Sequence, residues 1–266
     1  MKRKKFTNPG HKKDRPEKPP VAKDPQKMRL NRYLAKAGVC SRRDADKHIT
    51  GGSVDVNGKT VTELGTIVNI KDEVRFKGKL LTPEEKVYIL MNKPKDVITT
   101  TSDPQGRKTV MDIIGHAASQ RLFPVGRLDR NSTGLLLLTN DGELTKKLTH
   151  PSYDKSKIYD VYLDKDFSQS DADRLVKGLR LEDGVQDVDG VSYPDPSDKR
   201  QIGIEIHSGK NRIIRRMMEA LGYRVVKLDR VYFAGLTKKN LKRGRWRYLN
   251  RKEIAMLYMG STKQQR

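Results

Sequence analysis

Short apolar runs separated by turn residues recur along most of the chain. One pair flanks a loop rich in Gly, Asn and Ser, with Leu122–Val125 before it and Leu135–Leu138 after it. Runs of this kind predict buried strands. Residues 88–91, 157–163 and 201–206 predict three more strands, and Asn57-Gly58, which lies between two alternating runs, predicts a β-hairpin.

Helical spacing marks other segments. A first short helix is predicted from Leu30 to Ala37, where Gly38 ends it. Ser41 is placed to cap a second helix, which stops at Gly51. Further helices are predicted over 141–148, 168–179 and 211–221. In the last of these, apolar residues line one face and Arg212, Arg215 and Arg216 share the opposite one.

Two domains with flanking tails account for this pattern. Residues 1–27 contain ten Lys or Arg against three acids, with five prolines and almost nothing apolar, so we expect a disordered basic tail. Helices followed by small strands make a compact module over 28–85, which ends in a polar break. A larger α+β domain is expected over 86–257, and 258–266 form a short flexible C-terminal tail.

The charge balance narrows the classes of partner. The 266 residues have a formal net charge of +23, which favours a polyanion. No apolar run approaches the length of a membrane span, and no secretory signal is visible. The single cysteine, Cys40, excludes an internal disulfide and offers no metal cluster. We therefore expect a cytoplasmic protein that needs no metal.

The loop between the two central strands carries the candidate chemistry. Asp129 lies between Arg127 and Arg130, and loops fixed to rigid strands often hold functional groups. Nearby guanidiniums keep a carboxylate ionised and can also bind phosphate oxygens. Spacing alone allows an alternative, in which these residues form a surface ion-pair cluster in a turn.

A family resemblance separates the two readings. Residues Gly126–Gly142 follow G-R-L-D-x-x-[ST]-x-G-L-L-[LI]-[LF]-T-N-D-G without a gap, and this segment resembles the catalytic-aspartate motif of pseudouridine synthases that modify ribosomal RNA. The resemblance implies that Asp129 is the essential catalytic residue. It also implies a mixed, mainly antiparallel sheet in the larger domain.

Two further motifs of that family follow in order. K-x-Y places Tyr159 at the active-site tyrosine that packs against the target base, and Gly209–Met217 resembles G-[RK]-N-R-Q-[VI]-R-R-M. The resemblance implies that Arg215 pairs with Asp129. Two departures are Ile213, where the family usually has glutamine, and Asp96, where a glycine commonly follows N-K-P.

The first domain resembles the small RNA-binding domain first recognised in ribosomal protein S-four. Residues Arg29–Asp46 follow R-L-[ND]-x-x-L-A-x-A-G-x-x-S-R-R-x-A-[DE]. The resemblance implies phosphate contacts from the basic residues of the helix pair. The full set of expected RNA-binding residues is Arg29, Arg32, Arg42, Arg43, Lys47, Arg127, Arg130, Arg212 and Arg216.

The implied function is isomerisation of a uridine in ribosomal RNA to pseudouridine, without a cofactor. A hydrolysing glycosidase would want two carboxylates flanking the bond, whereas one central carboxylate stands here among arginines. The overall pattern favours a large-subunit target, and we expect a monomer. A noncatalytic ribosome-assembly factor is the main alternative, and a DNA-binding regulator lacks a recognisable base-reading helix.

Two other residues invite functional readings that we set aside. His150, which precedes a proline at a predicted helix end, is expected to cap or pack rather than to act as a base. Trp246 lies in a basic segment, 238–252, that is expected to add RNA-binding surface. We expect Trp246 itself to anchor packing.

Overall fold

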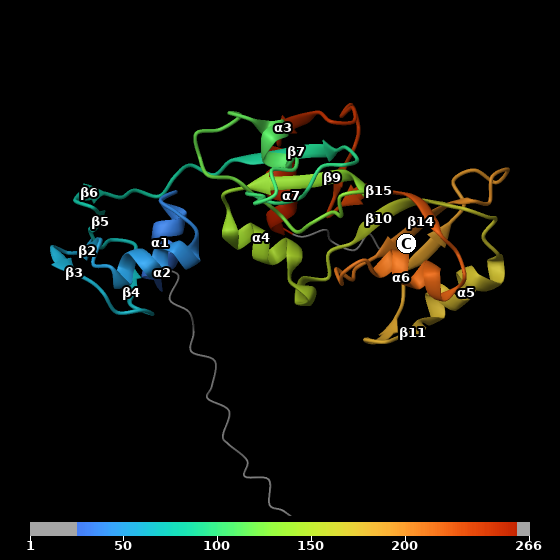
Figure 1. Cartoon of the computed structure of the whole chain (residues 1–266), viewed down its shortest axis with the longest axis horizontal. Helices are drawn as coiled ribbons and strands as arrows, with labels where there is room; N and C mark the ends of the chain where they lie inside the picture. The colour runs from blue at the N-terminus through green and yellow to red at the C-terminus, as the bar shows by residue number, and fades with distance from the viewer. Residues whose placement is uncertain (1–25, 260–266) are drawn as a thin grey trace, which may run out of the picture. The chain divides into compact units, whose positions relative to one another are not determined.

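The computed structural model describes residues 26–259 (Figure 1). The basic tail expected at 1–27 and the C-terminal tail expected at 258–266 therefore lie outside the described residues, except for positions 26, 27, 258 and 259. Lys27 belongs to the first strand and Met259 to the last helix. Regular structure thus begins earlier and ends later than the sequence indicated.

The chain divides into two compact units. One takes in the described residues through Tyr33 together with Arg42–Leu81, and the other takes in Leu34–Ser41 and the described residues from Thr82 onward.

The first unit is built from short elements. Its strand β1 (Lys27–Arg29) pairs antiparallel with β4 (Ile67–Asn69), and a four-stranded sheet has the order β3-β2-β5-β6. These four strands are β2 (Val54–Val56), β3 (Lys59–Thr60), β5 (Val74–Phe76) and β6 (Lys79–Leu80). The predicted helix pair is confirmed as α1 (Leu30–Lys36) and α2 (Arg42–Thr50).

The predicted hairpin is confirmed as well. Asn57 and Gly58 join β2 to β3, and their φ angles are 51° and 77°. Positive φ at both central residues is the backbone of a two-residue turn that matches the twist of its strands. Lys77 and Gly78 repeat this geometry between β5 and β6, with φ of 49° and 79°.

A nine-stranded sheet forms the second unit, with the main order β13-β14-β10-β15-β9-β7-β17. Neighbours are antiparallel except β15 and β9, which are parallel, so the expected mixed and mainly antiparallel sheet is confirmed. These strands are β7 (Tyr88–Lys93), β9 (Thr133–Thr139), β10 (Lys157–Leu163), β13 (Gly190–Ser192), β14 (Gln201–Ile206), β15 (Val225–Phe233) and β17 (Trp246–Tyr248).

Shorter strands extend this arrangement. β8 (Phe123–Pro124) pairs with β9, and β16 (Leu236–Thr237) pairs with β15. A separate hairpin consists of β11 (Leu179–Leu181) and β12 (Gly184–Gln186).

Helices cover the two halves of the sheet differently (Figure 1). In one half, α5 (Gln169–Lys177) and α6 (Ile213–Ala220) pack on one face of β10, β14 and β15. In the other half, α4 (Gly142–Thr149) and α7 (Arg251–Met259) cover one face of β7 and β9, and α3 (Val110–Ile114) covers the opposite face. Burial on both faces explains why Leu135–Leu138 is an unbroken apolar run. No helix in the described part of the chain is long and apolar enough to cross a membrane.

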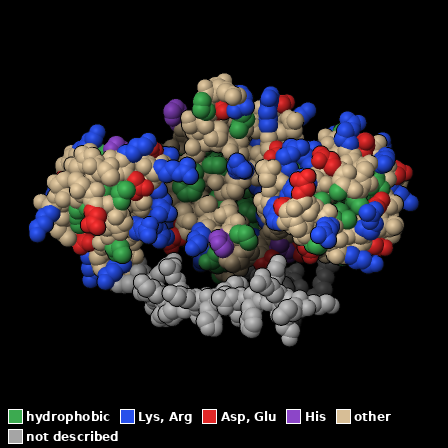
Figure 2. Space-filling view, turned by 60° about the horizontal axis from the view of Figure 1, so that its bottom comes forward, with side chains coloured by type: hydrophobic (Ala, Val, Ile, Leu, Met, Phe, Trp, Pro, Cys, Tyr) green, Lys and Arg blue, Asp and Glu red, His purple; other side chains and the backbone are tan. Residues whose placement is uncertain are grey.

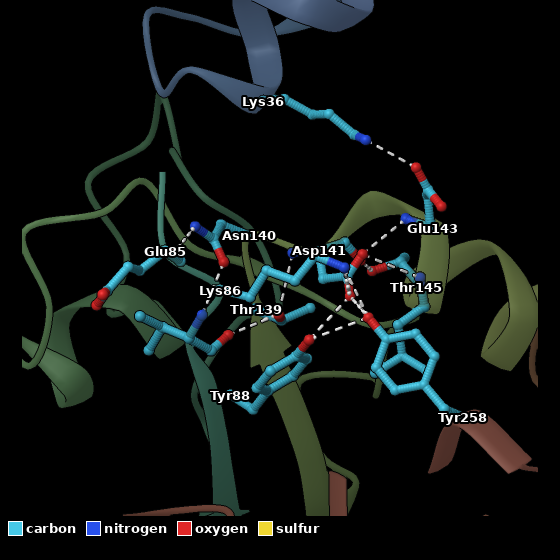
Figure 3. Close-up of polar contacts among 12 residues, drawn as sticks. Lys36, Glu85, Lys86, Tyr88, Thr139, Asn140, Asp141, Glu143, Thr145 and Tyr258 are labelled. Atoms are coloured by element: carbon cyan, nitrogen blue, oxygen red, sulfur yellow. Dashed lines mark hydrogen bonds and ion pairs between the residues drawn. The ribbon is translucent and has the colours of Figure 1, made fainter. Parts of the chain in front are cut away.

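The end of the central motif fixes the start of α4 (Figure 3). The Asp141 carboxylate accepts the backbone N–H groups of Glu143 and Leu144 at 3.1 and 3.2 Å, as an N-cap. It also accepts the hydroxyls of Tyr88, at 2.9 Å, and Tyr258, and pairs with Lys86 at 3.0 Å. Burial raises the pKa of Asp141, but these hydrogen bonds outweigh burial and hold the pKa below its usual value. One buried carboxylate therefore joins β7, α4 and α7.

The two set-aside residues have the structural roles expected of them. The His150 ring accepts the backbone N–H of Ser152 and caps the short 3₁₀ turn Pro151–Tyr153. Trp246 is half-buried on β17 and packs against the core under α3.

Candidate active site

Asp129 lies on the loop between β8 and β9, as predicted. The loop is pinned on both sides of this residue. Thr99 donates its hydroxyl to the Leu128 carbonyl at 2.8 Å, and the Ser132 backbone N–H donates to the Asp129 carbonyl at 3.0 Å. About a third of the Asp129 side chain is exposed, so its carboxylate is held by a rigid loop and remains open to a ligand.

Asp129 opens into a cavity of about 260 Å³ in the second unit. The loop after β8, the start of β10, the end of β15 and the segment before α6 all line it. Among the described residues that form the lining, Asp129 is the sole acid. The charged lining residues are Arg127, Asp129, Lys157, Lys210, Arg212 and Arg230.

The cation nearest Asp129 differs from the expected one. The Arg212 guanidinium lies 3.7 Å from the Asp129 carboxylate, whereas Arg215 donates to the Val225 carbonyl at 3.0 Å. Within the residues that the structure describes, no ion pair within 4.0 Å joins Arg215 to Asp129. Arg215 is still close enough for Asp129 to act on it: burial and then Arg212 lower the pKa of Arg215, and Asp129 opposes them.

Backbone geometry explains why Arg212 reaches the carboxylate. Arg212 occupies the position just before α6 in the left-handed region, with φ of 48°, and its side chain caps no helix N–H. This conformation turns the chain before the helix begins, so Arg212 leaves the row of arginines on which the helical pattern had placed it. Periodicity assumes helical backbone at every position and therefore could not show this turn.

The two arginines beside Asp129 in sequence have different surroundings. Arg127 is exposed and lines the cavity, but Arg130 pairs with Asp96 at 3.4 Å. Asp96 has φ of 64°, and its backbone N–H donates to the Arg130 carbonyl at 2.9 Å. A left-handed backbone here explains why a glycine would suit this position.

Tyr159 reaches the cavity from β10, as the motif implied. It is half-buried and lies opposite Ile204 on β14 and opposite Arg230 on β15. Its ring is thus held by strands on both sides and faces the space beside Asp129.

Three polar side chains at this site were not singled out from the sequence: Lys157 is half-buried, and Ser132 and Arg230 are buried. Lys157 lines the cavity and donates to the carbonyls of Lys155, His207 and Ser208. Burial, with help from Arg230, lowers the pKa of Lys157 to about 8. Arg230 and Ser132 also line the cavity, with 3% and 1% of their surfaces exposed. The K-x-Y motif could have pointed to Lys157, whereas Arg230 lies in a strand without a recognised pattern.

The other expected RNA-binding residues lie on the surface of their units. Arg29, Arg42, Arg43 and Lys47 are exposed and Arg32 is half-buried in the first unit. Arg216 pairs with Asp183 of the β11–β12 turn at 2.9 Å. Lys and Arg side chains are spread over the visible face of the protein, as Figure 2 shows. In the described range, no three or more His, Cys, Asp or Glu side chains gather as a metal ion would need.

Comparison with known families agrees with this geometry. Residues 87–220, which include the Asp129 loop, Tyr159 and α6, match the RNA pseudouridylate synthase family. The chain belongs to this family. Residues 28–74 match the S4 domain, the RNA-binding module that the first unit resembles.

Similar synthases align along most of their length. The chain is 41% identical over 232 residues to ribosomal large subunit pseudouridine synthase B of Bacillus subtilis, covering 86% of this chain and 95% of that protein. It is 37% identical over 234 residues to the dual-specificity RNA pseudouridine synthase RluF of Escherichia coli, covering 87% and 78%. A crystal structure of a pseudouridylate synthase superposes with a TM-score of 0.63 at 28% identity, covering 86% of this chain and 99% of that one.

This RNA pseudouridine synthase therefore presents one partly exposed carboxylate beside an aromatic ring, in a cavity with a basic lining. Such a cavity suits a nucleotide taken out of its stack, because the aromatic ring can pack against the base and the cations can meet the phosphates.

Proposed function

We propose that this synthase isomerises one uridine of large-subunit ribosomal RNA to pseudouridine, with Asp129 as the catalytic residue. The observation that carries the proposal is the position of Asp129, the sole acid among the described residues lining a basic cavity. The similarity to a large-subunit synthase over 86% of the chain supports the choice of RNA.

The reaction replaces one glycosidic bond of the nucleotide by another. The glycosidic bond between N1 and C1′ breaks, the uracil turns, and a bond forms between C5 and C1′ while the C5 proton is lost and N1 gains one. Asp129 acts on the ribose, either by attacking it or by removing a ribose proton. Tyr159 packs against the extruded uracil, and Arg212 orients the Asp129 carboxylate.

Binding of RNA has to offset the extrusion of the base, which costs a few kcal/mol. Phosphate contacts from the exposed cations at the cavity and on the first unit provide the binding free energy that offsets this cost. Arg127, Lys210 and Arg212 serve at the cavity, and Arg29, Arg42, Arg43 and Lys47 serve on the first unit. We propose that the protein acts as a monomer.

The test uses ribosomal RNA from a strain that lacks this gene. Naked RNA and isolated subunits are incubated with the wild-type protein or with Asp129→Asn, and pseudouridine is mapped by carbodiimide-blocked primer extension. We expect one new stop in large-subunit RNA with the wild type and none with the variant. Asp160→Asn is the matched control, since Asp160 neighbours Tyr159 on β10 but hydrogen-bonds Gln201 and lies outside the cavity lining.

Each component of the proposal can fail separately. A new stop in small-subunit RNA would overturn the choice of RNA, and conversion by Asp129→Asn would overturn the role of that residue. The absence of any new stop would favour a noncatalytic assembly factor.

A further inference from the structure

Two buried polar groups at the cavity lack hydrogen-bond partners among the described residues. They are the Ser132 hydroxyl and Nη2 of Arg230. Buried polar groups in folded proteins are nearly always paired, so an orphan at a ligand cavity indicates a group whose partner arrives with the ligand. Here two such orphans line the same cavity, one on β15 and the other in the loop just before β9.

The Arg230 side chain is held in place by one hydrogen bond from Nε and by contact with an aromatic ring. Its Nε donates to the Leu135 carbonyl at 2.8 Å, and its guanidinium lies over the Phe233 ring at 4.6 Å. Lys157, a half-buried cation of the lining, already donates to three carbonyls, so all three of its N–H groups are used. Arg230 is therefore the buried cation with donors left for a ligand.

Strand register places Arg230 beside Tyr159, and Ser132 lies in the loop just before β9. Arg230 lies directly opposite Tyr159 in the β10–β15 pair, so the two side chains are on the same face of the sheet. On its other side Arg230 faces Gly134 of β9, whose backbone approaches so closely that a Cβ there would come within 3.0 Å of the Arg230 backbone. Ser132 lies two residues before Gly134. A base that packs against Tyr159 would therefore have its edge toward Arg230 and Ser132.

The cations of the cavity also differ in how deeply they are buried. Lys210 and Arg212 are exposed, whereas Arg230 and Ser132 are almost fully buried. The phosphates of an extruded nucleotide remain near solvent and its base enters deepest. The exposed cations thus suit the phosphates, and the two orphans suit the base.

We propose that Arg230 and Ser132 bind the Watson–Crick edge of the extruded uracil, with Arg230 donating to O4 and the Ser132 oxygen accepting N3–H. This inference rests on the proposed function and adds the residues that select the base. Cytosine has an amino donor at position 4 and an acceptor at N3, so it would face the donor-only guanidinium with its own N–H groups. The pair therefore rejects cytosine as well as binding uracil.

The same contact has a consequence for the reaction. When the N1–C1′ bond breaks, its electron pair stays on the uracil and is shared with the ring oxygens. A guanidinium beside O4 stabilises this charge until the pair forms the C5–C1′ bond. Arg230 then acts on the chemical step as well as on selection.

The experiment combines protein and RNA changes. A stem-loop RNA bearing the mapped uridine is made with uridine, 4-thiouridine, 2-thiouridine or cytidine at the target, and with a neutral methylphosphonate 5′ to the target uridine. Single-turnover rates are measured for the wild type, Arg230→Met, Arg230→Lys and Ser132→Ala. RNA affinity is measured separately in the inactive Asp129→Asn background.

Loss of one charged hydrogen bond predicts that Arg230→Met lowers the single-turnover rate about 10- to 100-fold. Sulfur accepts hydrogen bonds weakly, so 4-thiouridine should slow the wild type but leave Arg230→Met unchanged. The penalties for 2-thiouridine and for the methylphosphonate should be the same in both proteins. Arg230→Lys should recover part of the rate, and the uridine-over-cytidine preference in affinity should shrink in both Arg230→Met and Ser132→Ala.

Matched controls are Arg174→Met and Ser156→Ala, because these residues pair with Asp171 and Glu205 outside the cavity lining. A 4-thiouridine penalty that persists in Arg230→Met would make Arg230 a structural residue and overturn the inference. A methylphosphonate penalty that disappears in Arg230→Met would assign Arg230 to the phosphate instead, which also overturns it. Absence of turnover in the wild type would contradict the proposed function alone, because the affinity preference needs no turnover.

Discussion

Lys93 is the side chain on which the shape of the Asp129 loop depends most. It is fully buried, and its ammonium donates to the carbonyls of Pro94, Arg130 and Ser132 at 3.0, 3.3 and 2.8 Å. The last two carbonyls belong to the turn that follows Asp129. One ammonium therefore fixes the end of β7 to this turn.

Replacing Lys93 by Met should loosen the turn without touching RNA. We expect kcat to fall on the order of 10- to 100-fold, because small misplacements of a reacting group are costly, while RNA affinity stays unchanged. Lys95→Met is the control, since Lys95 is exposed two residues away. An affinity loss equal to the loss in kcat/KM would show that Lys93 contacts RNA instead.

Lys93 also makes the stability of the protein depend on pH. Burial lowers the pKa of Lys93 to about 8, with Asp129 and Asp96 opposing the shift. Between pH 8 and the usual value of 10.5, the unfolded chain keeps this proton and the folded chain does not. The free energy of unfolding contributed by this residue should therefore rise with pH across that window. Urea unfolding measures the free energy of unfolding of the wild type and of Lys93→Met across this range. The wild-type value should rise with pH relative to the value for Lys93→Met, and a constant difference between the two would contradict the assignment.

Among single residues, the sequence predicted those site positions that belong to a family motif. Asp129 and Tyr159 line the cavity as the motifs implied. The local turn at Arg212 altered which arginine meets the carboxylate, and the burial of Lys93, Ser132 and Arg230 depends on strand pairing across the whole chain. No local pattern contains that pairing.

Among the elements, the short parallel contact between β9 and β15 has the strictest requirement. Gly134 has φ of 107°, and a Cβ there would come closer than 3.0 Å to the backbone N and O of Arg230. Both the backbone conformation and the space demand glycine.

Gly134→Ala should therefore separate the two strands locally. We expect a loss of unfolding free energy of about 3 kcal/mol or more, since strain and a backbone clash combine. Thermal and urea unfolding measure it, with Gly142→Ala as control because a Cβ at that helix position meets nothing. A change below about 1 kcal/mol would mean that the strands adjust easily.

The elements that were predicted are those whose periodicity agrees with their burial. The strands at 88–93, 157–163 and 201–206 and the helices that begin after Asp141 and Ser168 lie where the pattern put them. β1 and the β11–β12 hairpin were not predicted, because three-residue strands are too short to show a period. β15 was not predicted either, because its buried positions do not alternate.

For the whole molecule, the net charge of +23 sets the expected salt dependence of RNA binding. Each phosphate contact releases counterions, so affinity falls linearly with salt on logarithmic axes. Removing residues 1–25, which contain nine of the basic residues and leave β1 in place, should flatten this slope without changing which uridine is modified. Filter-binding titrations over a range of salt concentrations measure it, and an unchanged slope would exclude the segment from RNA contact.

The core under α4 and α7 has a consequence for synthesis on the ribosome. This cluster joins Tyr88, Leu90 and Leu135 to Leu249 and Leu257, which come from the far end of the chain. The cluster under α5 and α6, in contrast, draws all its members from residues 159–228. The part translated second can therefore close its core first, and the part that carries Asp129 waits with apolar strands uncovered until α7 has left the exit tunnel.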